Sequence, residues 1–395
     1  MSNADRRDAP PGSYVANHAA GTLVPAVIAV LVRRGVDFPS AEDAVQEALI
    51  SALETWPQDP PRDPKGWLIA VAWRKFLDAA RADVSRQRRE LEAAIEPPSD
   101  LGPAKDDSLW LYFLCAHPIL SQDAAVALTL RAVGGLTTRQ IAEAYLIPEA
   151  TMAQRISRAK RRLAGLPLDR PGDVGTVLRV LYLVFNEGYS GDVDLASEAI
   201  RLGRQLVALT DDPEIAGLLS LMLLHHARRA SRADPGSRLI PLAEQDRSRW
   251  DTTLIAEGVA ILQRALSRDR LGEYQAQAAI AALHADAQTA AETDWEQIVE
   301  WYDELLRLTD SPVVRLNRAV AVGEARGARA GFEALGGVDS GVPRYAAVSA
   351  YLHERAGELQ RAAELYAEAS RIATSVPERD HLTREAARVR QLWRS

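Results

Sequence analysis

Apolar residues recur along this chain at intervals of three and four, which is the spacing of one face of an α-helix. The clearest example is the set Met152, Ile156, Ala159 and Leu163, which is interspersed with polar and basic residues. One-by-one alternation of apolar and polar residues, the signal of a β-strand, is not convincing in any segment. The pattern therefore predicts an all-α protein made of many short amphipathic helices.

Residues 120–166 have the pattern of a helical hairpin with a tight turn. A Gly-Gly pair ends one helix, and Thr137 with Gln140 has the spacing of a capping box that begins the next. Pro148 suits the first turn of a further, longer helix. A short helix, a turn and a longer helix are typical of a helix-turn-helix that enters the DNA major groove. The alternative is an ordinary pair of amphipathic helices.

The outward face of the longer helix favours DNA binding. Phosphates are bound by Arg or Lys, and base edges by side chains with several hydrogen-bonding atoms. Residues 121–168 contain seven Lys or Arg and three Asp or Glu, a local net charge of +4 in a chain whose net charge is −7. The residues expected on this face are Thr151, Gln154, Arg155, Arg158 and Arg161.

Residues 41–56 predict a helix nearer the N-terminus. Val45, Leu49 and Leu53 follow one another at a spacing of four, so we expect their side of the helix to face the core. Ser40 is expected to cap the helix. Acidic and amide residues on the remaining surface would, on spacing alone, form a solvated face.

A proline-rich loop separates that helix from another, for which Asp63 is the expected cap and Pro64 the first residue. This helix carries Trp67, Trp73 and Phe76 among Arg and Lys residues. Aromatic rings beside cations are suited to stacking on unpaired bases. Each ring taken alone is better explained by burial in the core.

The order of these pieces resembles a bacterial extracytoplasmic-function (ECF) sigma factor of the sigma-70 family. The D-x-x-Q-E sequence of Asp43, Gln46 and Glu47 is similar to sigma region 2.2, which implies docking on the β′ clamp helices of core RNA polymerase. The pattern W-x(4)-A-x-R-x(3)-D-x(2)-R is similar to regions 2.3 and 2.4, which melt and read the promoter −10 element. The residues implied for −10 DNA are Trp67, Trp73, Arg74, Lys75, Asp78 and Arg81. Trp73 is a departure, because such families often have a basic or small residue there.

The helix-turn-helix is similar to sigma region 4, which reads the promoter −35 element. This resemblance implies a second contact with the polymerase, at the β flap. The residues implied for −35 DNA are Arg139, Thr151, Gln154, Arg155, Arg158, Lys160, Arg161 and Arg162. Contacts to phosphates would make the binding strongly dependent on salt.

Composition excludes several classes of site. Hydrophobic residues make up 47% of the chain and the single cysteine is Cys115, so we expect no disulfide framework and no multi-cysteine metal site. Cys115 is expected to be a small buried residue, and His117 is not expected to bind metal. The N-terminus has no apolar signal region and no apolar run has membrane-spanning length. We therefore expect a cytoplasmic protein that has no cofactor, no metal, no catalytic residues and no membrane contact, and is not an enzyme.

The last 220 or so residues are acidic, and they carry the whole net charge of −7. Near the end, Gly357 and Ala369 lie twelve residues apart with Ala362, Ala363 and Tyr366 between them, which resembles a tetratricopeptide (TPR) repeat. A weaker match covers residues 317–336. The alternative is a set of helical hairpins that do not repeat.

As a whole, the chain resembles the ECF sigma factors that have a long C-terminal extension with such repeats. The expected parts are a disordered N-terminus (1–12), region 2 (13–92), a linker (93–118), region 4 (119–168) and the TPR-like extension (172–395). The resemblance implies that the extension regulates activity, and contact with regions 2 and 4 would either block DNA or hold an active arrangement.

Two alternatives remain open from sequence. The chain could be a one-component DNA-binding regulator with a helical sensor domain that does not bind polymerase core. It could also be a scaffold whose repeat-like domain captures partner peptides, although this leaves the Arg-rich helix unexplained. The polar pairs Asn186–Glu187 and Trp250–Asp251 could suggest catalysis, but no nucleophile, metal set or phosphate loop accompanies them. We expect them to cap helices or bond between helices.

Overall fold

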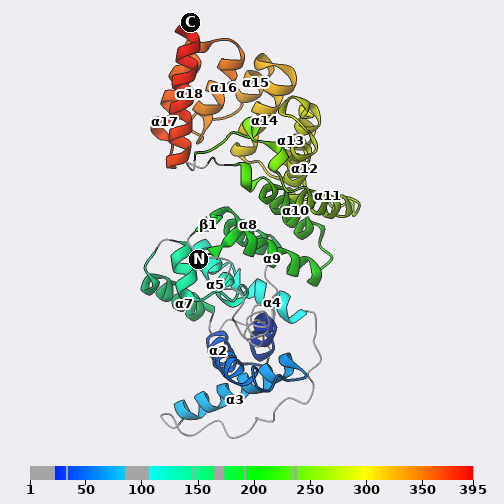
Figure 1. The fold of residues 1–395 in the computed structure, drawn as a ribbon, viewed down its shortest axis with the longest axis vertical. Coiled ribbons are helices and arrows are strands. Elements are labelled where there is room, and N and C mark those ends of the chain that lie inside the picture. Colours follow the sequence, from blue (N-terminus) through cyan, green and yellow to red (C-terminus); the bar gives the residue numbers. More distant parts are fainter. Residues whose placement is uncertain are drawn as a thin grey trace. The chain divides into compact units, whose positions relative to one another are not determined.

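The part of the chain that the structure describes is helical almost throughout, which confirms the all-α prediction (Figure 1). This computed structural model describes residues 23–32, 34–84, 106–145, 147–163, 173–190, 193–232, 234 and 238–394. The N-terminal segment expected to be disordered lies outside these residues. Two compact units are present, Met1–Thr210 (unit 1) and Asp211–Ser395 (unit 2).

Unit 1 contains nine described helices and one small ladder of strands. It begins with a helix at residues 23–32 and continues with α2 (Phe38–Thr55), α3 (Pro64–Val84), α4 (Asp106–Cys115), α5 (Gln122–Ala132), α6 (Thr138–Ala144), α7 (Glu149–Leu163), α8 (Val174–Glu187), β1 (Tyr189–Ser190), β2 (Val193–Asp194) and α9 (Leu195–Leu209). The strands are antiparallel and only two residues long, too short for a sequence pattern to predict.

The ends of α2 and α3 test the predicted caps. Asp63 accepts a hydrogen bond from the Gly66 amide at 3.0 Å, as predicted. The prediction for Ser40 is wrong, because α2 begins earlier and Asp37 is its cap, accepting from the Ser40 amide at 3.1 Å. Proline at the start of α2 does not interrupt it, because the first turn needs no amide donor there.

The predicted core face of α2 is also wrong in part. Leu53 is 50% exposed and Leu49 is half-buried. The buried stripe instead contains Ala41, Val45 and Ala48, and α2 packs on α3. The spacing of the large apolar residues therefore predicted the inward side of α2 incorrectly in part.

Part of the segment expected to be a linker is helix α4, which packs on α5, α8 and α9. Tyr112 is buried and its hydroxyl donates to the carbonyl of Leu202 in α9 at 3.1 Å. Burial raises the pKa of Tyr112, so this hydroxyl stays a donor. Arg201 of α9 also donates to the carbonyl of Gly134, at 3.3 Å. The first two helices of the extension are thus packed into unit 1.

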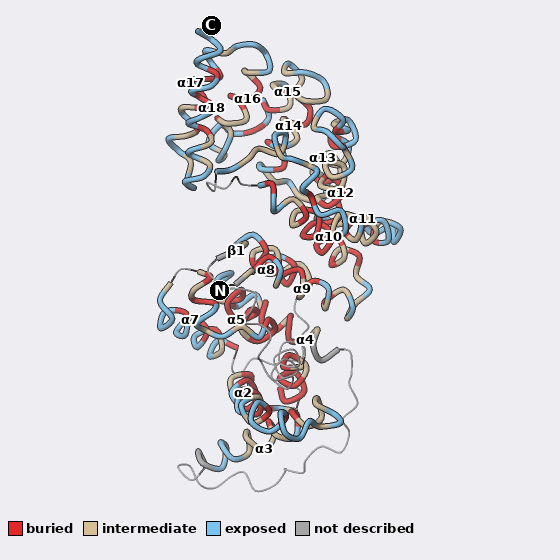
Figure 2. Tube along the Cα trace, in the orientation of Figure 1, coloured by how far each residue is buried: buried red, intermediate tan, exposed pale blue. Residues whose placement is uncertain are grey.

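Unit 2 is a succession of helices in which the closely packed pairs are neighbours or next neighbours in the chain. Its helices are α10 (Pro213–Ala227), α11 (Thr252–Leu266), α12 (Glu273–Asp286), α13 (Trp295–Leu308), α14 (Pro312–Arg326), α15 (Ala328–Leu335), α16 (Tyr345–Arg355), α17 (Leu359–Ile372) and α18 (Val376–Arg394), with short 3₁₀ turns at Arg229–Ser231, Leu242–Glu244, Arg247–Arg249 and Ala290–Glu292. Buried positions form stripes along these helices (Figure 2). None of the described helices combines the length and apolar character that crossing a membrane requires.

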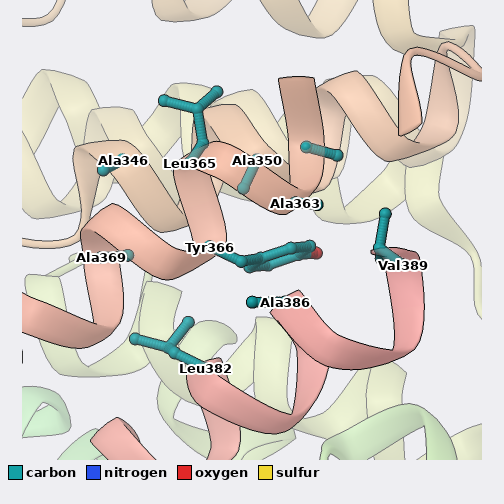
Figure 3. Packing of buried hydrophobic residues seen from close by; sticks show 10 residues of the cluster. Ala346, Ala350, Ala363, Leu365, Tyr366, Ala369, Leu382, Ala386 and Val389 are labelled. Atoms are coloured by element: carbon teal, nitrogen blue, oxygen red, sulfur yellow. The ribbon is translucent and has the colours of Figure 1, made fainter. Parts of the chain in front are cut away.

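The repeat-like segment forms the last hairpin of this unit. Gly357 joins α16 to α17 with φ of +78°, a conformation that favours glycine. Ala362, Ala363 and Ala369 are buried, and Tyr366 points from α17 toward α18 (Figure 3). The Tyr366 hydroxyl donates to Glu354 at 3.1 Å. Small residues thus allow the three helices to approach, as the TPR-like spacing predicted.

The weaker repeat match, residues 317–336, forms the hairpin of α14 and α15. Gly327 makes the turn with φ of +90°. A Cβ atom on Gly331 would lie 3.0 Å from the Cα atom of Gly323 and 2.6 Å from Leu352 Cδ2. Both glycines are therefore required by close helix contact rather than by backbone conformation.

We expect Gly331→Ala to destabilise the α14–α15 hairpin by about 1–3 kcal/mol, because the new methyl group overpacks this crossing. Hydrogen–deuterium exchange of the full-length chain should show faster exchange in both helices, with a lower melting temperature. Gly337→Ala is the matched control, since a Cβ atom there meets nothing within 4 Å. Equal behaviour of the two variants would contradict this account of the packing.

A second prediction concerns the end of unit 1. A chain that ends after residue 168 lacks α8 and α9 and should melt at least roughly 2 °C below one that ends after Thr210, because more than about 1 kcal/mol of apolar burial is lost. Circular dichroism of the two truncated chains measures the difference. Identical melting curves would show that α8 and α9 contribute nothing to the stability of unit 1.

Candidate nucleic-acid interface

The helix-turn-helix is formed by α6 and α7, and the predicted capping box is present. The Gln140 amide donates to the Thr137 hydroxyl at 3.2 Å, and the Thr137 amide donates to the Gln140 side chain at 2.9 Å. Both reciprocal bonds fix the start of α6. The chain then turns into α7, which packs on α5 and α6.

The predicted inward stripe of α7 is confirmed, because Met152, Ile156, Ala159 and Leu163 are all buried. With that side fixed, the opposite face is left for solvent. The exposed residues of the predicted −35 set are Arg139, Thr151, Gln154, Arg158, Arg161 and Arg162. Within α7, Thr151, Gln154 and Arg158 lie on one face at positions i, i+3 and i+7.

Contacts among these exposed residues are local and weak. Arg158 Nη2 lies 3.5 Å from the Gln154 side-chain oxygen, and Arg162 Nη1 lies 3.5 Å from the carbonyl of Ile119. Arg139 pairs with Glu143 at 2.8 Å, and this hydrogen bond raises the pKa of its guanidinium. Exposed pairs of this kind contribute little stability, so a phosphate can replace the acidic partner.

Two members of the predicted −35 set are turned toward the protein instead. Arg155 Nη1 lies 3.5 Å from Asp123 of α5, and its side chain is 28% exposed. The Lys160 ammonium pairs with Glu42 of α2 and lies 3.7 Å from Asp43. The structure therefore separates these two cations from the exposed face that carries the other members.

The residues predicted to dock on polymerase lie on α2. Asp43 and Glu47 have side chains that are 78% and 61% exposed, and Gln46 is half-buried. Ile50 and Leu53, which are 53% and 50% exposed, continue the same side of the helix. Sequence reasoning missed these two residues as surface groups, because it assigned Leu53 to the core face and gave Ile50 no role.

Glu42 is a further residue that sequence reasoning missed. It is 1% exposed, and Arg131 of α5 donates from Nε to its Oε1 atom at 3.1 Å. Gln46 donates to the same oxygen at 3.4 Å. The signal was present in the sequence, because Glu42 falls in line with Val45 on the buried side of α2, where an acid is unexpected.

The predicted −10 residues are on α3, which packs on α2. Trp67 packs edge-on against Trp56 with ring centroids 5.6 Å apart, and Trp73 lies 5.7 Å from Phe76. Trp67, Trp73 and Phe76 are half-buried, so each ring shares in the packing while part of its surface is accessible. Core packing and base stacking are both compatible with this placement.

The charged members of the −10 set are exposed or partly exposed. Lys75 Nζ lies 3.6 Å from Glu47 and is 39% exposed, and Arg81 lies 3.7 Å from Asp78. Arg74 is exposed. The structure thus brings the −10 candidates of α3 beside the polymerase candidates of α2.

Asp251, one of the polar residues that could have suggested catalysis, has a structural role. Asp251 caps α11 by accepting from the amides of Thr253 and Leu254 at 2.9 and 3.0 Å, as expected for a helix cap. Cys115 is buried, as predicted. Among the described residues there is no group of three or more His, Cys, Asp or Glu arranged to hold a metal ion.

Comparison with known proteins identifies three segments. Residues 21–86 match the family model of sigma-70 region 2, residues 110–163 match that of sigma-70 region 4, and residues 173–266 match a family of unknown function, DUF6596. The last match runs across the boundary between the two units at residue 210.

Two relatives extend this result. An uncharacterized protein of Rhizobium meliloti (strain 1021) is 40% identical over 406 residues, covering 92% of this chain and 95% of the relative. A probable ECF RNA polymerase sigma factor, SigI, of Mycobacterium tuberculosis (strain CDC 1551 / Oshkosh) is 27% identical over 202 residues, covering 44% of this chain and 68% of that protein. No solved structure matches the chain. The chain therefore belongs to the sigma-70 family of RNA polymerase sigma factors, in the ECF group, with a C-terminal helical extension that includes a DUF6596 segment.

Proposed function

We propose that this protein binds core RNA polymerase, directs promoter-specific transcription initiation, and is regulated by its C-terminal extension. The observation that carries the proposal is the presence, in unit 1, of two exposed helix faces of different chemistry. One is an acidic and apolar face on α2, and the other is a basic face on α7. A factor that joins polymerase to DNA needs both.

The face of α2 is suited to a protein partner. Asp43 and Glu47 supply exposed carboxylates, while Ile50 and Leu53 supply exposed apolar surface at the next turns. Apolar side chains grouped with charges in this way are typical of protein contact sites. We assign this face, with Gln46, to the β′ clamp helices of the polymerase.

The face of α7 is suited to DNA. Its exposed arginines can bind phosphates, and Thr151 and Gln154 can reach base edges. We assign it to the −35 element, with a β flap contact by region 4. We assign the −10 element to α3, where half-buried rings lie next to Arg74 and Lys75.

The extension is the regulatory part of the proposal. Its first two helices, α8 and α9, are packed on region 4 within unit 1. The remaining helices form a separate compact unit with the repeat-like packing that commonly presents a binding surface. We place the protein in the cytoplasm, acting as a non-enzymatic factor.

The polymerase face generates the first test of this function. Replacement of Asp43, Gln46 and Glu47 by Ala should reduce binding to purified core polymerase at least about tenfold, because charged contacts at a partner interface are lost. Surface-immobilised polymerase and the full-length chain provide the measurement. A one-component regulator would instead show no polymerase binding in the unmodified protein.

A second variant separates apolar contact from charge. Ile50→Ala with Leu53→Ala should also weaken polymerase binding. Val313→Ala with Ile372→Ala is the control, since these side chains are 51% and 62% exposed but lie in unit 2. If both pairs bind polymerase as the unmodified chain does, the α2 face is not the docking site.

The DNA face generates another prediction. Arg158→Ala should weaken binding to duplex DNA and lower the slope of log affinity against log salt by about 1, because one phosphate contact is lost. Fluorescence anisotropy at several salt concentrations measures this slope. Arg329→Ala, at an arginine of unit 2 whose side chain is 94% exposed, is the control and should leave the slope unchanged. An unchanged slope for Arg158→Ala would remove this residue from the interface.

A further inference from the structure

Glu42 is an unusual buried group. Among the described residues it is the only one with a formally charged side chain in the fully buried class, at 1% exposure. A carboxylate removed from water is strongly unfavourable unless cations and hydrogen bonds compensate it. Helix α2 can therefore keep the Glu42 carboxylate buried only while the compensating groups stay in contact with it.

Both compensating cations come from region 4. Arg131 of α5 binds one carboxylate oxygen at 3.1 Å and also donates to the carbonyl of Leu136 at 3.0 Å. The Lys160 ammonium of α7 pairs with the other oxygen. These side chains are only 16% and 17% exposed, so the whole ion triad is nearly excluded from solvent. It joins region 2 to region 4.

Lys160 cannot serve this triad and DNA at the same time. Its ammonium lies against Glu42 and 3.7 Å from Asp43, so a phosphate would have to displace both carboxylates. Arg158 and Arg161 on the same helix remain exposed. The contact therefore removes one cation from the basic face and holds α7 against α2.

We propose that Glu42, Arg131 and Lys160 form an autoinhibitory latch that closes region 4 on region 2 and is exchanged for DNA phosphates when the factor opens. The inference rests on the proposed function, because it treats α7 as the DNA-reading helix. A buried ion pair gains little net stability after desolvation, which makes it a contact that can be opened as well as closed.

The latch also connects the two binding faces. Asp43 belongs to the proposed polymerase face and is the second carboxylate beside Lys160. Polymerase docking on α2 therefore competes with the Lys160 ammonium for the Asp43 carboxylate. Release of Lys160 follows docking, so polymerase binding and DNA binding favour each other.

Closure can be tested without DNA or polymerase. A water-soluble carbodiimide joins an amine to a carboxylate in direct contact, and the chain has only four lysines, at positions 65, 75, 105 and 160. Mass spectrometry of the treated full-length protein should find Lys160 joined to Asp43 or Glu42. The Lys75–Glu47 pair, 3.6 Å apart within region 2, is the internal control. A Lys75–Glu47 product without any Lys160 product would overturn the latch.

Inhibition is tested with Glu42→Gln, which removes the buried charge at nearly constant volume. We expect a loss of the Lys160 product and about tenfold tighter binding to a fluorescein-labelled mixed-sequence duplex, a typical size for coupled sites. Glu54→Gln, an exposed acid on the same helix, gives the same change of net charge and should alter neither. Arg131→Gln opens the latch from the side of region 4. The same crosslink and DNA-affinity measurements on this variant serve if Glu42→Gln folds poorly.

The outcomes separate the latch from the proposed function. If Glu42→Gln and Arg131→Gln both lose the Lys160 crosslink but bind DNA with unchanged affinity, autoinhibition is overturned. This holds even if the unmodified chain binds core polymerase. Failure of the unmodified chain to bind polymerase would overturn the proposed function, whereas the crosslink tests closure by itself. Tighter DNA binding by both opening variants, with Glu54→Gln unchanged, would support the latch.

Discussion

The arrangement of regions 2 and 4 depends on one electrostatic constraint, which is that the buried carboxylate of Glu42 must have cations beside it. Arg131 and Lys160 meet this requirement from two helices of region 4. Separation of the regions would return three charges to water, where each is well solvated. The same contact that orders unit 1 therefore also withholds a cation from the basic face of α7.

Apolar packing builds the rest of the molecule, and small residues make it possible. The buried side of α2 is rich in alanine, and Gly323 with Gly331 lets α14 cross α15. In unit 1 such packing extends past the helix-turn-helix to α8 and α9, so the end of region 4 in the family match is not the end of the compact unit. The extension consequently has two parts, one packed on region 4 and one in unit 2.

Local features were predictable from the sequence because they depend on neighbours along the chain. The capping box of Thr137 and Gln140 and the buried stripe of α7 need only helical spacing and short-range hydrogen bonds. The inward side of α2 was not predictable in this way. Periodicity alone favours large apolar residues such as Leu53, whereas packing on α3 and α7 buries Ala41 and Glu42.

Other differences also arise from long-range contacts. The side chains of Arg155 and Lys160 contact Asp123 and Glu42, which are distant in sequence. Helical spacing therefore predicted Arg155 on the DNA side, and the family resemblance implied the same for Lys160. We propose that this protein is a promoter-recognition factor, and mapping of transcript 5′ ends tests this proposal. Purified core polymerase with the full-length protein should initiate on fragmented genomic DNA at discrete sites that share two upstream elements. The same transcripts from core polymerase alone, or no initiation with the protein present, would contradict the account.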